Sequence, residues 1–149
     1  MIDIVDHITQ KAILNDWIPI VADANSVNYE LNNVDLASGQ NFLYITLPTI
    51  TRGKETQVYN GELTFRLELM LGRKFEAETF SSIAETAKQK YESRLFELSN
   101  QLNDFLNTIF NCSNEIEEMG NTEITMAKNI FSASIDAALT TVTIKAWNQ

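Results

Sequence analysis

The sequence predicts an α+β fold: a mostly antiparallel sheet of about four strands packed against one long helix, with a short N-terminal helix. Apolar and polar residues alternate strictly over positions 62–71, and an apolar stripe recurs at steps of three and four over positions 80–109. The length of 149 residues fits one domain, and 44% hydrophobic residues supply a core without disulfides or structural metal. We therefore expect a single domain over residues 1–149, with elements in the order α-β-β-α-β-β.

The first helix is expected over residues 2–17, where Ile4, Ile8 and other apolar residues recur at helical spacing. Pro19 lies just beyond it and would end the helix, because its ring and missing N–H do not fit a helix interior. Residues 25–40 are rich in Asn, Asp, Ser and Gly, which predicts a loop.

Two strands follow in the predicted order. Residues 42–50 alternate and are rich in aromatic and β-branched side chains, but Pro48 near their end indicates an edge or a strand terminus. Residues 62–71 form the second strand, with one dry and one wet face. The two strands are expected to form a hairpin whose connection is either short, near Gly53, or long, reaching Gly61.

The long helical pattern over residues 80–109 corresponds to about 42 Å of helix, well above the usual length. Ser82 and Glu85 have the spacing of a capping box, although a start one turn earlier is also open. We expect an interruption at Ser99 and Asn100, since both side chains compete for backbone hydrogen bonds.

Two further strands are predicted at residues 123–131 and 140–147, after a turn signal at Gly120. Asp136 and the two alanines after it are expected to form the connection between them. Whether the two strands pair with each other is left open by the sequence.

The charge excludes several functional classes. The formal net charge is −9, which argues against a nucleic-acid binder or a binder of anionic membranes, because both bind through exposed Lys and Arg. No apolar run approaches the length of a membrane span, so we expect no membrane association. From the acidic net charge we also expect no sequence-specific nucleic-acid binding. The single cysteine, Cys112, excludes an intramolecular disulfide and has no basic neighbour in sequence to activate its thiol.

Few residues have the spacing of a metal site. Asp3, Asp6 and His7 lie within one helical turn, but the chain has one histidine and no third ligand is apparent, so we interpret the acids as residues of a helix start. Glu117 and its acidic neighbours Glu115 and Glu118 lack the spacing of a calcium loop and are interpreted as a solvated loop.

The sequence also lacks nucleophile and phosphate-binding motifs of known spacing. We therefore expect no catalytic residue, no metal and no cofactor. An enzyme would need a site centred on His7 or on glutamates that the sequence does not display.

The cations are unevenly distributed, since eight of eleven lie between Arg52 and Arg94. They flank the best-defined strand and are expected to meet the acidic surface of a neighbouring copy, head to tail. The alternative is that cations are simply uneven in a short chain. Two aromatic residues are further candidates: Tyr59 in the predicted loop, and Phe96 off the main apolar stripe of the long helix. Each also fits a partly buried surface position. The candidate interface residues are Arg52, Lys54, Tyr59, Arg73, Lys74 and Phe96.

The layout resembles that of a known group of proteins. A helix containing Ile-Val-Asp-His-Ile (residues 4–8) precedes strands Phe-Leu-Tyr-Ile-Thr-Leu-Pro (42–48) and Glu-Leu-Thr-Phe-Arg-Leu-Glu-Leu-Met (62–70). A long helix follows, and the strand Thr-Val-Thr-Ile-Lys-Ala-Trp (141–147) comes last. This arrangement resembles the small tail-terminator and tail-completion proteins of long-tailed bacteriophages.

The resemblance implies a non-enzymatic virion structural protein that is assembled in the host cytoplasm. Such proteins form a ring, usually of six copies, at the head-proximal end of the tail tube, where they stop tube growth and join tail to head. The implied partners are further copies of the chain and other tail or neck proteins. The rival interpretation is a monomeric ligand-binding or regulatory module, with a cavity between residues 63–71 and the long helix.

Overall fold

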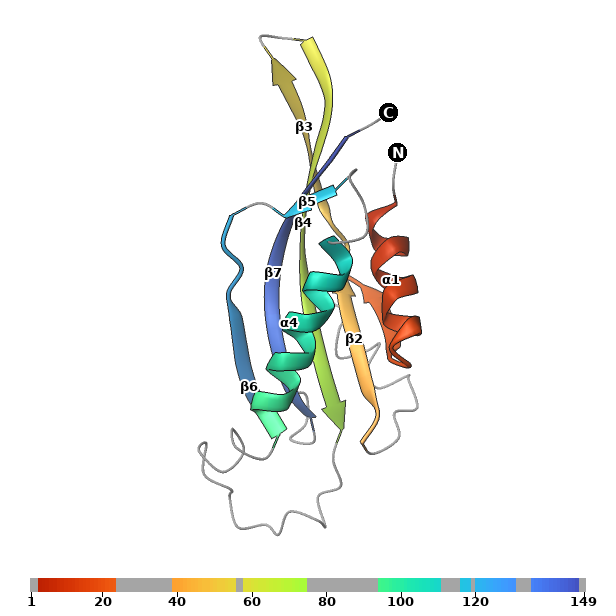
Figure 1. Ribbon diagram of the computed structural model, residues 1–149, viewed down its shortest axis with the longest axis vertical. Helices are drawn as coiled ribbons and strands as arrows, with labels where there is room; N and C mark the ends of the chain where they lie inside the picture. Colours follow the sequence, from red (N-terminus) through yellow and green to blue (C-terminus); the bar gives the residue numbers. More distant parts are fainter. Residues whose placement is uncertain are drawn as a thin grey trace.

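The computed structural model describes residues 3–23, 39–55, 58–74, 94–110, 116–118, 120–130 and 135–147. In these parts of the chain, two helices lie against one mixed sheet of seven strands (Figure 1). The α+β class is as predicted, but the architecture of about four strands against one long helix is wrong. The elements are α1 (Ile4–Leu14), β1 (Ile18–Ala22), β2 (Asn41–Thr46), β3 (Thr49–Glu55), β4 (Val58–Lys74), α4 (Phe96–Phe110), β5 (Ile116–Glu118), β6 (Ile124–Ile130) and β7 (Ile135–Trp147).

The sheet is built around its two longest strands, β4 and β7. They pair antiparallel over thirteen residues, from Glu62 opposite Trp147 to Lys74 opposite Ile135. β2 and β3 pair one after the other with the edge of β4 that faces away from β7. In the same way, β5 and β6 pair with the edge of β7 that faces away from β4. β1 lies outermost beside β2 and is the one parallel strand among those described.

Two prolines explain part of the difference in strand number. The predicted strand at 42–50 is divided, because β2 ends at Thr46, Pro48 interrupts the ladder, and β3 begins at Thr49. Pro19, interpreted from the sequence as a helix stop, lies inside β1. A strand at the edge of a sheet tolerates proline, since one side of its backbone has no ladder partner.

The predicted connection of the hairpin is also corrected. Glu55 of β3 pairs with Val58 of β4, so the strands continue past both Gly53 and Gly61 and the connection lies at neither glycine. The pairing instead shifts between Arg52 and Lys54, and Gly61 on the opposite strand has φ of +81°. Both glycines therefore lie at a β-bulge rather than in a turn, and Gly61 adopts there the positive φ that glycine tolerates.

The C-terminal strands pair with each other, which the sequence left open. Ile124 of β6 lies opposite Thr140 of β7. The predicted connection at Asp136 is wrong: this residue is inside β7 and is 1% exposed. The short strand β5 was not predicted, because its residues are polar and acidic.

Helix α1 confirms the predicted first helix, with Asp3 as its N-cap accepting a hydrogen bond from the Asp6 amide at 3.0 Å. Helix α4 confirms the C-terminal part of the long helical pattern, while the predicted capping box at Ser82 lies outside the described residues. No interruption occurs at Ser99, since α4 is continuous there and the Ser99 hydroxyl donates to the Phe96 carbonyl at 2.8 Å.

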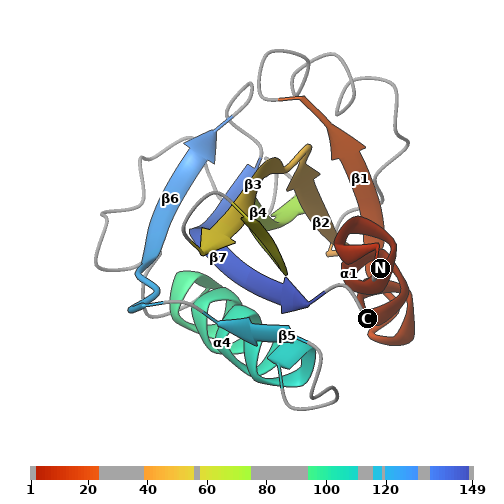
Figure 2. The same ribbon diagram turned by 90° about the horizontal axis from the view of Figure 1, so that it is seen from above.

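The sheet is curved, with α1 and α4 on its outer side (Figure 2). The main core lies between these helices and the outer face, and it includes the alternating apolar residues of β4. A second, smaller core lies on the inner face. Its members include Phe42, Tyr44 and Met70, which is why all six residues of β2 are buried.

Candidate functional site

The hairpin formed by β3 and β4 contains three of the predicted interface residues. Arg52 is exposed on β3, and Lys54 lies opposite Tyr59 of β4. Arg52 lies opposite Leu63 within the paired sheet, whereas pairing of β4 with β7 begins only at Glu62, so the described residues 54–55 and 58–61 project beyond the rest of the sheet (Figure 1). We call these residues the arm. Its four β4 residues before Glu62 extend about 13 Å at the usual rise of a strand.

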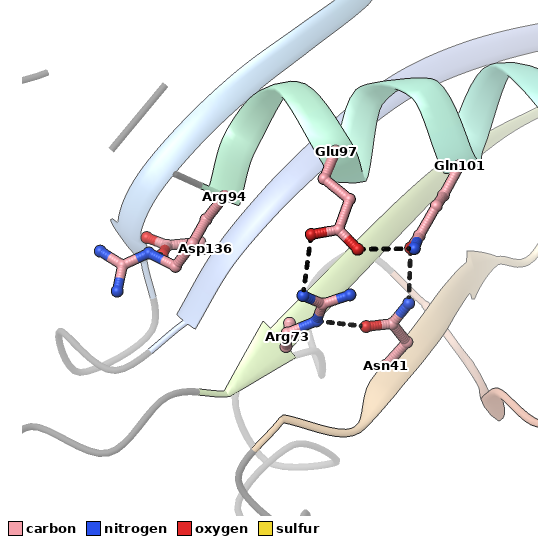
Figure 3. Close-up of polar contacts among 6 residues, drawn as sticks. All are labelled: Asn41, Arg73, Arg94, Glu97, Gln101 and Asp136. Carbon is pink, nitrogen blue, oxygen red and sulfur yellow. Dashed lines mark hydrogen bonds and ion pairs between the residues drawn. The ribbon is translucent and has the colours of Figure 1, made fainter. Parts of the chain in front are cut away.

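The structure places Arg73 in a different setting from the arm. Four side chains from β2, β4 and α4 form a closed ring of hydrogen bonds (Figure 3). Arg73 Nε donates to Asn41 Oδ1 at 2.7 Å, and Asn41 Nδ2 donates to Gln101 Oε1 at 2.8 Å. Gln101 donates to Glu97 at 3.2 Å, and Glu97 pairs with Arg73 at 3.4 Å. The Arg73 guanidinium therefore fastens α4 to the sheet.

Lys74 is the last residue of β4 and is exposed. Its carbonyl accepts a hydrogen bond from the Gly39 amide at 2.8 Å, so the backbone here is tied to the chain entering β2. Lys74 and the arm lie at opposite ends of β4. The predicted cations are thus divided into two groups rather than forming one patch.

A buried ion pair lies beside the polar ring and was missed from the sequence. Arg94 Nε lies 2.8 Å from Asp136 Oδ2, and the side chains are 9% and 1% exposed (Figure 3). The pair joins Arg94, two residues before the start of α4, to Asp136, the second residue of β7. An acid inside the apolar run Ile-Asp-Ala-Ala-Leu was the available signal, because an acid in such a run is buried only with a partner.

A cleft of about 560 Å³ opens on the inner face of the sheet, between β2, β4, β7 and the residues around β6. The buried part of its lining is mainly apolar and includes Met70 and Tyr44, whose hydroxyl donates to the Asp23 carbonyl at 2.7 Å. The exposed part includes two carboxylates, Glu68 and Glu123, and the hydroxyl of Thr141. No basic side chain is among the described lining residues.

Large apolar side chains are exposed at the base of the arm. Leu47 is 58% exposed and Ile50 is 53% exposed. Ile50 pairs with Phe65, which belongs to the main core, so both point to the outer face of the sheet. Phe96 is half exposed at the start of α4, away from the buried stripe of that helix.

The described residues contain no group of three or more metal-ligating side chains. Asp3 acts as a helix cap, and His7 Nε2 lies 3.3 Å from the carbonyl oxygen of Ile109 on α4. Glu118 accepts a hydrogen bond from the Thr122 hydroxyl, whereas Cys112 lies outside the described residues. Among the described helices, none is long and apolar enough to span a membrane.

The comparisons with protein-family models and with curated protein sequences gave no match to this chain. The function is therefore argued from the arm, the cleft and the exposed apolar residues.

Proposed function

We propose that this chain is a non-enzymatic virion structural protein of a long-tailed phage, acting as a ring at the tail terminus or head-tail joint. The arm is the observation that carries the proposal. In the described parts of the chain, Lys54 and Glu55 pair with Tyr59 and Val58, and pairing of β4 with β7 begins only at Glu62. A projecting hairpin is useful to a protein that contacts neighbouring copies.

The exposed apolar residues support the same proposal. Leu47 lies in the short connection between β2 and β3, and Ile50 is the second residue of β3; both are exposed. Burying such residues against a neighbour removes apolar surface from water, at about 25 cal/mol for each Å². The exposed apolar residues therefore provide affinity, while the charged arm provides orientation.

Open strand edges add a third surface. Among the described residues, β1, β3, β5 and β6 each have one strand partner and therefore one open edge. Unpaired edges are potential sites of strand addition by another chain. β1 presents Val21, which is 39% exposed, and β6 presents Met126, which is 38% exposed.

The acidic character of the chain fits a ring through which DNA passes. The net charge of −9 would repel the phosphate backbone, so DNA would not adhere to a wall made of such subunits. This part of the proposal concerns the lumen alone and does not depend on the arm.

Electron microscopy of the purified protein tests the proposal. Closed rings with a central opening are expected in negative stain, at concentrations where mass measurements show oligomers. Compact particles without an opening, or open filaments in place of rings, would contradict the proposed function.

The second candidate is a monomeric ligand-binding module, and the cleft favours it. A volume of about 560 Å³ is within the range of small-molecule sites. The cleft lies on the inner face, however. The cavity expected for this class was between β4 and the long helix, and residues there, such as Leu67 and Leu69, are packed in the main core. A chain that remains monomeric and binds a small molecule in the cleft would support this candidate.

A further inference from the structure

The exposed part of the cleft contains a row of three polar side chains. Glu68 of β4 lies opposite Thr141 of β7. Ile124 of β6 lies opposite Thr140, so Glu123, one residue earlier, comes level with Thr141 on the side away from Glu68. Because neighbouring strands are about 4.8 Å apart, the two glutamates are about 10 Å apart at their Cα atoms, with the threonine between them.

The two carboxylates of this row are not neutralised by a base of the chain. None of the ion pairs among the described residues includes Glu68 or Glu123. Arg66 precedes Glu68 by two residues on the same face of β4, but it does not line the cleft. Two acids at the opening of a cleft create a negative potential there, which favours a positively charged ligand.

The next row along the strands is apolar. Met70 of β4 lies opposite Leu139 of β7 on one side and opposite Tyr44 of β2 on the other. The Tyr44 hydroxyl donates to the Asp23 carbonyl at 2.7 Å, so its hydrogen bond is made within the chain. Residues two apart in a strand are separated by about 7 Å. The cleft therefore has an apolar floor about one side-chain length from its carboxylates.

A primary ammonium group on an apolar body fits both rows. An ammonium has three N–H donors, and the polar row contains three acceptor groups, which are the two carboxylates and the Thr141 hydroxyl. A calcium ion fits less well, since it requires six to eight oxygen ligands and the floor provides none. The cleft volume of about 560 Å³ is that of a small-molecule site.

We propose that the cleft binds a small primary amine with an apolar body. The ammonium lies between Glu68 and Glu123, next to Thr141, while the body contacts Met70 and Leu139. This site is complete within one copy of the chain, so it goes beyond the proposed function: a ring subunit and a monomer would both have it. It also gives the second candidate function a class of ligand.

Calorimetric titration with 2-phenylethylamine tests the chemistry of the site. Saturable binding of one molecule per chain is expected, with a Kd in the millimolar range or tighter. 2-Phenylethanol has the same body without the charge and is expected to bind at least about tenfold more weakly, because charge-assisted hydrogen bonds are lost. The trimethylammonium analogue keeps the charge without N–H donors, and it too is expected to bind more weakly. Equal binding of the alcohol and the amine would overturn the inference.

Two variants assign the binding to the carboxylates. Glu68→Gln with Glu123→Gln is expected to weaken binding of 2-phenylethylamine by at least about tenfold. Asp104 on α4 and Glu117 on β5 are exposed and do not line the cleft, so Asp104→Asn with Glu117→Gln is a control with the same change in net charge. The control should bind within about twofold of the parent, and circular dichroism shows whether each variant retains the fold. Equal losses in the two variants would contradict the assignment.

Nuclear magnetic resonance locates the bound amine. Amide shifts that titrate with 2-phenylethylamine are expected at residues 68–70 and 139–141. Absence of saturable binding, or shifts confined to other parts of the chain, would overturn the inference. Rings formed by a chain that binds no amine would leave the proposed function standing without this site. Amine binding by a chain that never forms rings would support the site and contradict the proposed function.

Discussion

At the residue scale, close packing determines what the sheet tolerates. Gly72 lies opposite Phe42 in the pairing of β2 with β4, and the phenyl ring covers it. A Cβ at Gly72 would lie 2.3 Å from the nearest ring carbon. The glycine is needed here for space rather than for an unusual backbone angle.

We therefore predict that Gly72→Ala destabilises the protein by about 1–3 kcal/mol, the usual effect of overfilling a packed core. Urea denaturation of the parent and variant measures this loss. Phe42→Leu removes the ring that causes the clash, so Gly72→Ala should cost much less in that background. Equal losses in the two backgrounds would contradict this explanation.

Phe96 is a residue-scale test of the interface. Its side chain is 50% exposed, so Phe96→Ala is expected to leave the unfolding midpoint of the monomer nearly unchanged. The same substitution should weaken assembly by about tenfold if the ring is buried between copies, since aromatic anchors dominate interfaces. An unchanged oligomer mass under conditions where the parent assembles would remove Phe96 from the interface.

At the scale of elements, polar contacts attach α4 to the sheet at one end. The ring containing Arg73 and Asn41 joins the helix to β4 and β2, and the Arg94–Asp136 pair joins the helical segment to β7. Both sets of contacts lie at the same end of the sheet, away from the arm (Figures 1 and 3). Assembly through the arm, as proposed above, is therefore expected to leave these contacts undisturbed.

We predict that Asp136→Ala destabilises the protein by about 3–5 kcal/mol, because the Arg94 cation would stay buried without this carboxylate. Asp104→Ala is the matched control, since Asp104 is exposed on α4, and it should change stability by less than about 0.5 kcal/mol. Chemical denaturation measures both. A small loss for Asp136→Ala would show that the pair is dispensable.

The arm can be tested as a unit. Replacing residues 54–59 with Asn-Gly shortens the hairpin through a two-residue turn that suits antiparallel strands. Because residues 54–61 pair with no other element in the described parts of the chain, the shortened protein should keep the stability of the parent. It should also fail to form rings, and rings formed by it would exclude the arm from the contact.

The sequence predicted the elements whose patterns are simple. β4 alternates cleanly because Leu63, Leu67 and other apolar residues all face the helices, and α1 has a single apolar stripe. Asp136 was misplaced because its partner Arg94 is 42 positions away: the apolar run around the acid indicates burial, but nothing nearby in the sequence identifies the partner. Gly61 resembled a turn residue, since a bulge and a turn both require positive φ.

The candidate site was predictable only in part. The sequence singled out Arg52 and Lys54 as candidate interface residues because cations are scarce in this chain, and their role at an interface stays a prediction. The cleft was not found, since Tyr44, Glu68 and Glu123 come together only when the sheet curves and β6 joins it. Both faces of β2 are buried, because the second core covers its inner face.

At the scale of the whole molecule, the chain combines a stable body with surfaces that the body does not use. Two cores hold the sheet and its helices together, while the exposed Leu47 and Ile50 lie outside them and the cleft opens over the second core, whose Tyr44 and Met70 line it. A protein that acts through assembly requires this division, because it must fold before it finds its neighbours.

The most direct test of the account is the mass in solution, measured by light scattering across protein concentration at low and high salt. The account predicts a reversible increase from monomer to one closed oligomer, with assembly weakened at high salt because the charged contacts are screened. A chain that remains monomeric at every concentration and at both salt levels would contradict the central claim that this protein acts by assembling with itself.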